Sequence, residues 1–315
     1  MVAWLAILWV SRQELNGGRE GLGSEGFACW HRFITWASGW LGDPFRTFSG
    51  LVSTALNGID KMKNSFDQTD AAYCIAVAKT FPDVPHYLQA NYWWAYIHPH
   101  AVTFFERQWL VNLILWGNYK RLCNAVLNDY GHNLMGRTLQ IACAYGDLTP
   151  RLAQRIAPDG LLEIVDILPI QLENLSGKLP QDLPIKLHCM DSAALAFPDA
   201  SFDRALLFFL LHEQPQEVRE KTLAEALRVI RPGGTLTIVD YAPPGRLNPL
   251  RYFWMPVLDR LEPFARDLFT EEIGTWLPKS IGFATVSDRR FFGGMYQMLT
   301  LKVAEEEKIG IAGSK

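Results

Sequence analysis

From about residue 137 onward, short apolar segments alternate with segments in which apolar residues recur at helical spacing. The apolar segments predict strands at residues 138–143, 161–167, 185–191, 202–211 and 235–244. Helices are predicted at residues 149–156, 170–179 and 215–230, and Arg-Pro-Gly-Gly at 231–234 predicts a turn. The fourth strand segment is almost wholly apolar, as expected for a central strand covered on both faces. Strands that alternate with helices in this way predict an α/β fold with a doubly wound parallel sheet.

Polar residues follow the predicted strands, at the edge of the sheet where such folds bind ligands. Asp166 ends the second strand, where an acid can accept hydrogen bonds from both ribose hydroxyls of an adenosine group. A helix cap is the alternative role for Asp166. Asp191 and Ser192 follow the third strand and suit the adenine edge, although this pair also commonly caps helices. The same pattern places at this edge Gly146, His212 and Tyr241.

The turn after the first strand, Ala-Cys-Ala-Tyr-Gly-Asp at residues 142–147, contains a single glycine, Gly146. A dinucleotide-binding turn has the pattern Gly-x-Gly-x-x-Gly, because its backbone N–H groups must approach a pyrophosphate closely. The bulk of Tyr145 opposes such an approach. The sequence therefore favours an adenosyl cofactor that has no phosphates.

Net charge and cysteine content indicate which binding partners and which redox environment suit the chain. The 315-residue chain has a net charge of −3 and an isoelectric point near 6.2, so no basic field favours nucleic-acid binding. Its five cysteines are scattered and lack metal-ligand spacing, which indicates a reduced intracellular protein.

Aromatic residues concentrate between residues 92 and 119, ahead of the α/β region. Tryptophan and tyrosine suit an interface with one wet side, so this segment predicts either a buried helix pair or a surface for lipid or an apolar substrate. Residues 248–269 are apolar with interspersed arginines and suit a channel wall, a bilayer contact or an ordinary amphipathic helix. We divide the chain into an unassigned extension (1–75), an aromatic-rich helical lid (76–136), the α/β domain (137–305) and a tail (306–315).

The segment from residue 191 to 244, with Leu-Val-Asn-Leu-Ile-Leu-Trp-Gly-Asn-Tyr at 110–119 and Phe-Phe-Gly-Gly-Met-Tyr at 291–296, resembles the class I S-adenosylmethionine methyltransferases. It is most similar to the ubiquinone/menaquinone C-methyltransferase branch. That branch begins its first motif with an acid followed by x-Ala-Gly-Gly-Thr-Gly-Asp. The resemblance covers about residues 92–303 and implies a Rossmann-like fold that binds S-adenosylmethionine.

Departures from that motif resemble a second group, the rhodoquinone-biosynthesis (RquA) family. The motif acid is Gln140, two glycines are Cys143 and Ala144, and a threonine is Tyr145. The segments 92–99, 165–175 and 208–215 resemble the same family. This resemblance implies conversion of ubiquinone to rhodoquinone: the amino group of S-adenosylmethionine replaces a ring methoxy group, with support from Mn²⁺.

The altered motif has a physical interpretation. A carboxylate near the methionine ammonium raises the pKa of that ammonium, which suits an anchor but not a nucleophile. Gln140 is neutral, so the free amine should form more easily and attack an electrophilic quinone carbon, while Tyr145 fills the space of the missing glycines. The alternative is that Gln140 is a tolerated change in a true methyltransferase.

The resemblance implies roles for particular residues. Cofactor contacts are expected from Gln140, Ala142, Tyr145, Gly146, Asp147, Asp166, Ile167, Asp191 and Ser192. Candidate catalytic residues are His212, Glu213, Tyr145 and Tyr96, and candidate substrate contacts are Tyr92, Trp93, His98 and Tyr241. His212 is expected to act either as an acid/base partner of Glu213 or as a metal ligand. The candidate ligands for Mn²⁺ are His212 and Asp147.

Two rival functions follow from the same residues: a quinone C- or O-methyltransferase, and a non-catalytic quinone- or lipid-binding protein that has lost the cofactor. Because ubiquinone lies in the bilayer, the chain is expected to contact a membrane peripherally. The expected place is the cytoplasmic face of a bacterial inner membrane, with the matrix side of the mitochondrial inner membrane as the alternative. Further candidate partners are a second copy of this chain and other proteins of quinone biosynthesis.

Overall fold

The computed structural model describes residues 84–92, 96, 99–180, 182–245, 248 and 262–305, all within one compact unit that begins at Asp83. Within these described residues, four helices precede the first strand, namely α5 (His86–Tyr92), α6 (Pro99–Phe105), α7 (Gln108–Ile114) and α8 (Tyr119–Tyr130). They fall within the part of the chain predicted to form a helical lid; the division of the chain into domains stays a prediction. No helix of the described residues is long and apolar enough to cross a membrane.

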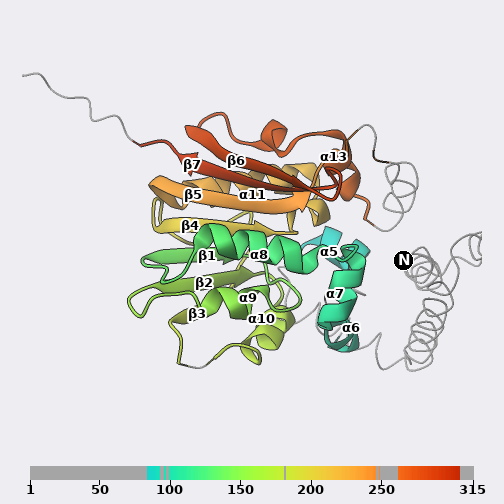
Figure 1. Cartoon of the computed structure of the whole chain (residues 1–315), viewed down its shortest axis with the longest axis horizontal. Coiled ribbons are helices and arrows are strands. Elements are labelled where there is room, and N and C mark those ends of the chain that lie inside the picture. Colours follow the sequence, from blue (N-terminus) through green and yellow to red (C-terminus); the bar gives the residue numbers. More distant parts are fainter. Residues whose placement is uncertain are drawn as a thin grey trace, which may run out of the picture. The chain divides into compact units, whose positions relative to one another are not determined.

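The α/β part follows the predicted order (Figure 1). Its elements are β1 (Arg137–Ile141), α9 (Leu148–Ala153), β2 (Leu161–Asp166), α10 (Pro169–Ser176), β3 (Ile185–Cys189), β4 (Phe202–Phe208), the 3-10 turn η2 (Leu211–Glu213), α11 (Gln216–Arg228) and β5 (Ile230–Tyr241). After these come α13 (Ala265–Thr270), the 3-10 turn η3 (Ile273–Trp276), β6 (Phe283–Phe291) and β7 (Tyr296–Val303).

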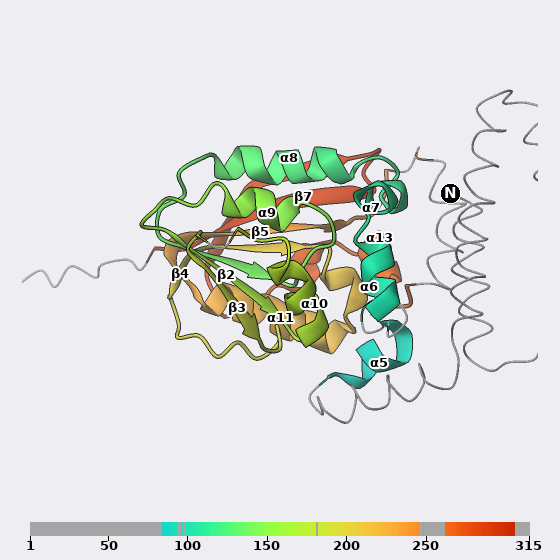
Figure 2. The same ribbon diagram turned by 90° about the horizontal axis from the view of Figure 1, so that it is seen from below.

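The seven strands form one sheet in the order β3-β2-β1-β4-β5-β7-β6. The five predicted strands are parallel to one another, which confirms the doubly wound arrangement. The sheet as a whole is mixed, because β7 pairs antiparallel with both β5 and β6. Helices α8 and α9 cover one face, and α11 covers the other (Figures 1 and 2). Central β1 and β4 are therefore mostly buried, whereas edge strand β3 is only partly covered.

Several predicted strand boundaries were wrong by two or more residues, and two of them have a clear backbone reason. The fourth strand ends at Phe208 rather than residue 211, because Phe209 adopts a left-handed conformation with φ of 55° and turns the chain into η2. The sequence at 231–234 does not form a turn before the fifth strand. It lies inside β5 as an irregularity, where the pairing passes from Phe202 opposite Ile230 to Arg204 opposite Thr235. Gly233, with φ of 78°, permits this extra length.

Candidate functional site

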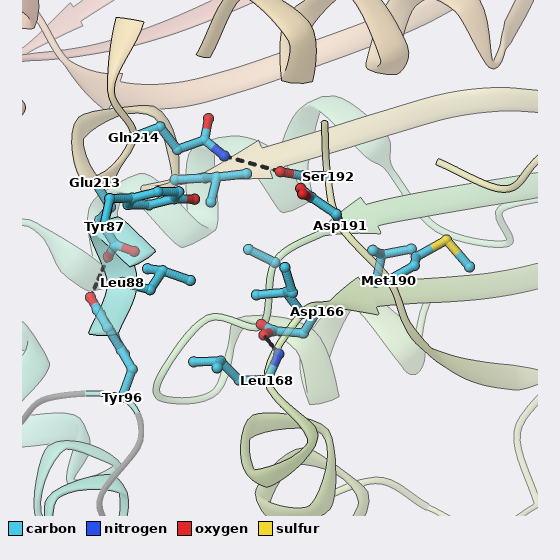
Figure 3. Close-up of a pocket in the computed structure, with 14 residues that line it drawn as sticks. Tyr87, Leu88, Tyr96, Asp166, Leu168, Met190, Asp191, Ser192, Glu213 and Gln214 are labelled. Atoms are coloured by element: carbon cyan, nitrogen blue, oxygen red, sulfur yellow. Dashed lines mark hydrogen bonds between the residues drawn. The ribbon is translucent and has the colours of Figure 1, made fainter. Parts of the chain in front are cut away.

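A pocket opens at the carboxyl ends of β1, β2, β3 and β4, with residues of α5 on its opposite wall (Figure 3). In that view Tyr87, Tyr96 and Glu213 lie on one side, and Asp166, Asp191 and Met190 lie on the other. The pocket is lined by Tyr87, Leu88, Tyr96, Ala142, Val165, Asp166, Ile167, Leu168, Met190, Asp191, Ser192, Leu210, Glu213 and Gln214. The structure thus brings together five of the nine predicted cofactor residues and two of the four predicted catalytic residues.

Asp166 is held at the pocket wall by backbone donors. Its two carboxylate oxygens accept hydrogen bonds from the backbone N–H groups of Cys143 (2.8 Å) and Leu168 (2.9 Å). Burial raises the pKa of Asp166 to about 6, although these hydrogen bonds favour its charged form. Asp166 therefore connects the first-motif turn to the end of β2 and places a carboxylate beside the pocket.

Asp191 and Ser192 lie on the same wall, beyond the end of β3. The Oδ1 atom of Asp191 accepts the backbone N–H of Ala193 at 2.8 Å, which closes a local turn. The Ser192 hydroxyl pairs with Thr222 at 2.9 Å and accepts the side-chain amide of Gln214 at 3.0 Å. Among the described residues no helix begins directly after Asp191, so the predicted capping role was wrong, and the residue closes a turn instead while it lines the pocket.

The first-motif turn carries backbone constraints that explain its one glycine. Gly146 has φ of 88°, and a Cβ atom there would lie 2.5 Å from the Tyr119 hydroxyl oxygen. That hydroxyl in turn accepts the backbone N–H groups of Asp147 (2.9 Å) and Leu148 (3.1 Å). Ala142 also has a left-handed φ, of 71°, although it is not glycine. Such a conformation costs about 1–2 kcal/mol in a residue with a Cβ atom, so the turn keeps a strained residue at the pocket wall.

Gln140 lies beneath the turn, fully buried, and does not line the pocket. Its side-chain nitrogen donates to the Ala142 carbonyl (3.1 Å) and to the Thr149 hydroxyl (2.9 Å). Its Oε1 atom is buried without a hydrogen-bond partner. A neutral amide therefore occupies the motif position where the resemblance expects an acid.

Tyr145 leaves the turn on the side of the preceding helices. Its ring stacks on Tyr96 with centroids 5.7 Å apart, and Gln171 donates to its hydroxyl at 2.8 Å. The next residue, Gly146, donates its backbone N–H to Glu106 at 3.0 Å, and Lys178 bonds the same Glu106 oxygen at 2.6 Å. Residues of the α6–α7 region and of α10 thus hold the part of the turn that has lost its glycines.

The turn η2 brings the candidate acid/base residues together. The Tyr96 hydroxyl donates to Glu213, and His212 Nε2 lies 3.7 Å from Glu213 Oε1. Burial raises the pKa of Glu213 to about 8. Burial opposes the charged form of His212, but Asp240 beside it raises the pKa of His212 to about 9. A carboxyl group with a pKa near neutrality at a pocket wall is suited to proton transfer.

The predicted substrate contacts that the structure describes are not brought together at the pocket. Tyr92 is buried and its ring tilts on Tyr96, with centroids 6.0 Å apart. Tyr241 does not line the pocket; its ring packs edge-on against His212 at 5.0 Å, because β5 lies one strand further along the sheet than β4. Trp93 and His98 lie outside the described residues, as do most of residues 248–261.

The described residues do not fit the expected Mn²⁺ site. Within them, no group of three or more His, Cys, Asp or Glu side chains is placed to hold a metal ion. His212 Nδ1 is engaged by Asp240 Oδ1 at 3.0 Å. Asp147 has its closest charged partner elsewhere, at 3.8 Å on Arg151 of the same helix turn. We therefore derive no step through a metal.

Sequence reasoning missed several residues of this region. The pocket residues Tyr87, Gln214 and Met190 were not among the predicted site residues, although Gln214 and Met190 adjoin predicted ones. Asp240 was also missed, although it precedes the last residue of β5 just as Asp166 ends β2. The rule that polar residues gather at strand ends would have found it.

Residues 138–234 match the family model of the methyltransferase domain. A demethylmenaquinone methyltransferase of Staphylococcus aureus (strain JH9) is 28% identical over 211 residues, which cover 60% of this chain and 85% of that protein. Among solved structures, the mitomycin 7-O-methyltransferase MmcR is 18% identical with a TM-score of 0.51, covering 65% of this chain and 58% of that one.

A second solved structure is more distant. The N-methyltransferase NodS from Bradyrhizobium japonicum WM9, in complex with S-adenosyl-L-homocysteine, is 13% identical with a TM-score of 0.44, covering 65% of this chain and 98% of that one. The MmcR structure has a TM-score of 0.51, so this chain and MmcR share a fold. Residues 138–234 therefore resemble a methyltransferase domain, and the chain has the class I S-adenosylmethionine methyltransferase fold.

Proposed function

We propose that this protein is a quinone methyltransferase that uses S-adenosylmethionine. The observation that carries the proposal is the similarity to a demethylmenaquinone methyltransferase over 85% of that protein's length. The pocket chemistry supports it, because carboxylates and a hydroxyl suit the ribose and adenine, while the apolar side chains of Leu168 and Met190 suit the adenine faces.

When bound, the cofactor supplies an electrophilic methyl group. The chain's own part is to orient the quinone ring and to take a proton from it. Glu213 and Tyr96 line the pocket and form one hydrogen-bonded pair, with His212 behind Glu213. Glu213 is the residue we propose as the proton acceptor, because its raised pKa makes it a stronger base than an ordinary carboxylate.

One observation favours a second function, amino transfer to ubiquinone to make rhodoquinone. Gln140 places a neutral, buried amide where the related methyltransferases have an acid. The amine nitrogen of the cofactor would then form a bond to the ring carbon as the methoxy group leaves with a proton as methanol. To leave the amino group on the ring, the bond between that nitrogen and the cofactor's Cα would then break as a Cβ proton moves to the nitrogen, which releases the rest of the cofactor as an α,β-unsaturated acid. Glu213 and Tyr96 would serve the same proton transfer in this reaction.

One experiment separates these functions. Purified protein is incubated with S-adenosylmethionine carrying carbon-13 in its methyl group and nitrogen-15 in its amino group. Demethylmenaquinone and ubiquinone are offered in turn, with and without Mn²⁺, and the quinones are analysed by mass spectrometry. A carbon-13 product supports methyl transfer, whereas a nitrogen-15 product supports amino transfer. Cofactor binding without either product would overturn both and favour a binding protein.

Changing Gln140 to Asp or to the isosteric Glu should suppress any amino transfer. Gln140 does not line the pocket, but its side chain donates to the carbonyl of the pocket residue Ala142, so a carboxylate here would add a negative charge just behind the pocket wall. An opposite charge nearby shifts a pKa by about 1–3 units, so the free amine should fall by up to about 10- to 1,000-fold at neutral pH. Methyl transfer should persist in these variants. Nitrogen-15 incorporation that is unchanged or higher in a folded variant would contradict the charge argument; thermal melting supplies the check on folding.

Replacing Asp166 with Asn should weaken cofactor binding about 10- to 100-fold, because hydrogen bonds to a charged acceptor contribute about 1.5–3 kcal/mol. Ribose hydroxyls favour the ionised carboxylate, so binding lowers the pKa of Asp166, which is about 6 in the free protein. Affinity should therefore rise as the pH rises through 6, and this dependence should disappear in the variant. Calorimetry at several pH values measures both effects. Asp159→Asn, an exposed aspartate at the amino edge of β2, is the matched control.

We further propose that the protein works at a membrane surface, on the cytoplasmic face of a bacterial inner membrane. A quinone with an isoprenoid tail lies in the bilayer, and Trp109 of α7 exposes 52% of its surface. Sedimentation with vesicles of anionic and zwitterionic lipid tests this. If the protein binds neither kind of vesicle, the proposal of a membrane surface is contradicted.

A further inference from the structure

Asp240, near the end of β5, is a fully buried carboxylate. Its Oδ2 atom accepts the backbone N–H groups of Leu211 (2.8 Å) and His212 (3.4 Å). Its Oδ1 atom accepts the backbone N–H of Tyr241 at 2.8 Å and lies 3.0 Å from His212 Nδ1. Asp240 therefore holds both the backbone and the side chain of the turn that carries the candidate acid/base residues.

The backbone N–H groups around Asp240 determine which atom donates in its contact with the His212 imidazole. Both oxygens of Asp240 already accept N–H groups, and an ionised carboxylate can only accept. His212 Nδ1 must therefore carry the proton in this contact. The other ring nitrogen, Nε2, faces Glu213 Oε1 at 3.7 Å, which is the side of the pocket. Consequently, His212 gains and loses its second proton at Nε2.

Aromatic contacts hold the imidazole in the same orientation. Tyr241 packs edge-on against the His212 ring at 5.0 Å, and Phe209 does so at 5.9 Å. Phe209 is also the residue with the left-handed backbone that starts the turn. The strained backbone of Phe209 persists beside the buried Asp240–His212 contact. This indicates that the surrounding contacts impose the geometry of η2.

We infer that Asp240 is a positioning residue of the transferase reaction: it fixes the Nδ1 proton of His212, so that Nε2 faces Glu213 and the Tyr96–Glu213 pair can exchange a proton with the substrate. This inference rests on the proposed function for its catalytic consequence. The orientation and protonation of His212 do not depend on that function and can be measured separately.

A double-mutant cycle tests the catalytic consequence. Asp240→Asn, His212→Gln and the double variant are compared for kcat, KM and cofactor affinity. If Asp240 acts through His212, Asp240→Asn lowers kcat about 100-fold or more with little change in cofactor affinity. In the His212→Gln background, Asp240→Asn should then change kcat by no more than about twofold. Two losses that multiply would overturn the inference, because they would mean an independent structural role.

Asp203→Asn is the matched control. Asp203 also accepts a backbone N–H, from Arg137 at 2.6 Å, but it lies near the amino end of β4. Its replacement should lower stability without lowering kcat in either background. A loss of kcat equal to that of Asp240→Asn would mean that any lost buried carboxylate contact loosens the site, and would overturn the specific role of Asp240.

Because Asp240→Asn can fail to fold, a measurement on the unaltered protein stands beside it. Nitrogen-15 NMR of protein labelled at histidine should show a hydrogen-bonded Nδ1 proton on one of the seven histidines, and this signal should be missing in His212→Gln. A His212 whose Nδ1 carries no proton would overturn the inference. If this proton is seen but no quinone is turned over, the proposed function fails while the positioning of His212 stands.

Discussion

Replacing Glu213 with Gln is expected to lower kcat about 10²- to 10⁴-fold, the usual contribution of a positioned acid/base group. Glutamine keeps the size of the side chain and can still accept the Tyr96 hydroxyl, but it cannot take a proton. Burial raises the pKa of Glu213 to about 8, so the variant also loses a pocket carboxyl group that titrates close to neutral pH. Quinone turnover measured with saturating cofactor checks the prediction.

The control for this change is Glu217→Gln, the same substitution at an exposed position in the first turn of α11. Its kcat should equal that of the unaltered protein. Cofactor affinity measured by calorimetry should be similar in both variants, because the proposed cofactor carboxylates, Asp166 and Asp191, remain. A Glu213→Gln variant with undiminished kcat would show that proton transfer does not pass through this residue.

Replacing Arg219 with Ala is expected to lower the free energy of unfolding by about 3–5 kcal/mol, the range for breaking a buried charged contact. The Arg219 guanidinium is fully buried and donates to the carbonyl groups of Leu211 (3.0 Å), Gln214 (3.0 Å) and Phe264 (2.9 Å). It also pairs with Asp267 at 3.3 Å. The variant removes the shared donor of these carbonyl groups, and the Leu211 carbonyl keeps a second donor, the backbone N–H of Gln214. Urea unfolding measures the loss.

Arg290→Ala serves as the comparison, because Arg290 pairs with Asp288 and Glu272 at the surface. Surface ion pairs contribute about 0–1 kcal/mol, so this variant should unfold almost like the original protein. An equal loss in both variants would contradict the special role of the Arg219 contacts. The Arg219 contacts flank η2, so a folded Arg219 variant should also lose activity through a loosened His212–Glu213 turn.

The strand pattern predicted much of the cofactor side of the site. Asp166 and Asp191 were placed correctly at the pocket because the carboxyl ends of parallel strands share one edge of the sheet. Tyr241 follows the same rule, yet it packs away from the pocket, because the rule gives the edge and not the distance along it. The strand ending at Phe208 was predicted too long, since no sequence pattern reveals that Phe209 is left-handed.

The apolar and polar pattern by itself determined the α/β class, the five parallel strands and the cofactor edge, because each depends on local periodicity. Only the tertiary structure decided which distant groups meet. Tyr96 reaches Glu213 across 117 positions of sequence, and Glu106 holds Gly146 across 40. Asp240 meets His212 because β4 and β5 are neighbours in the sheet. Such contacts depend on strand order and on how the first helices pack against the carboxyl edge, and neither is encoded in the spacing of residues along one segment.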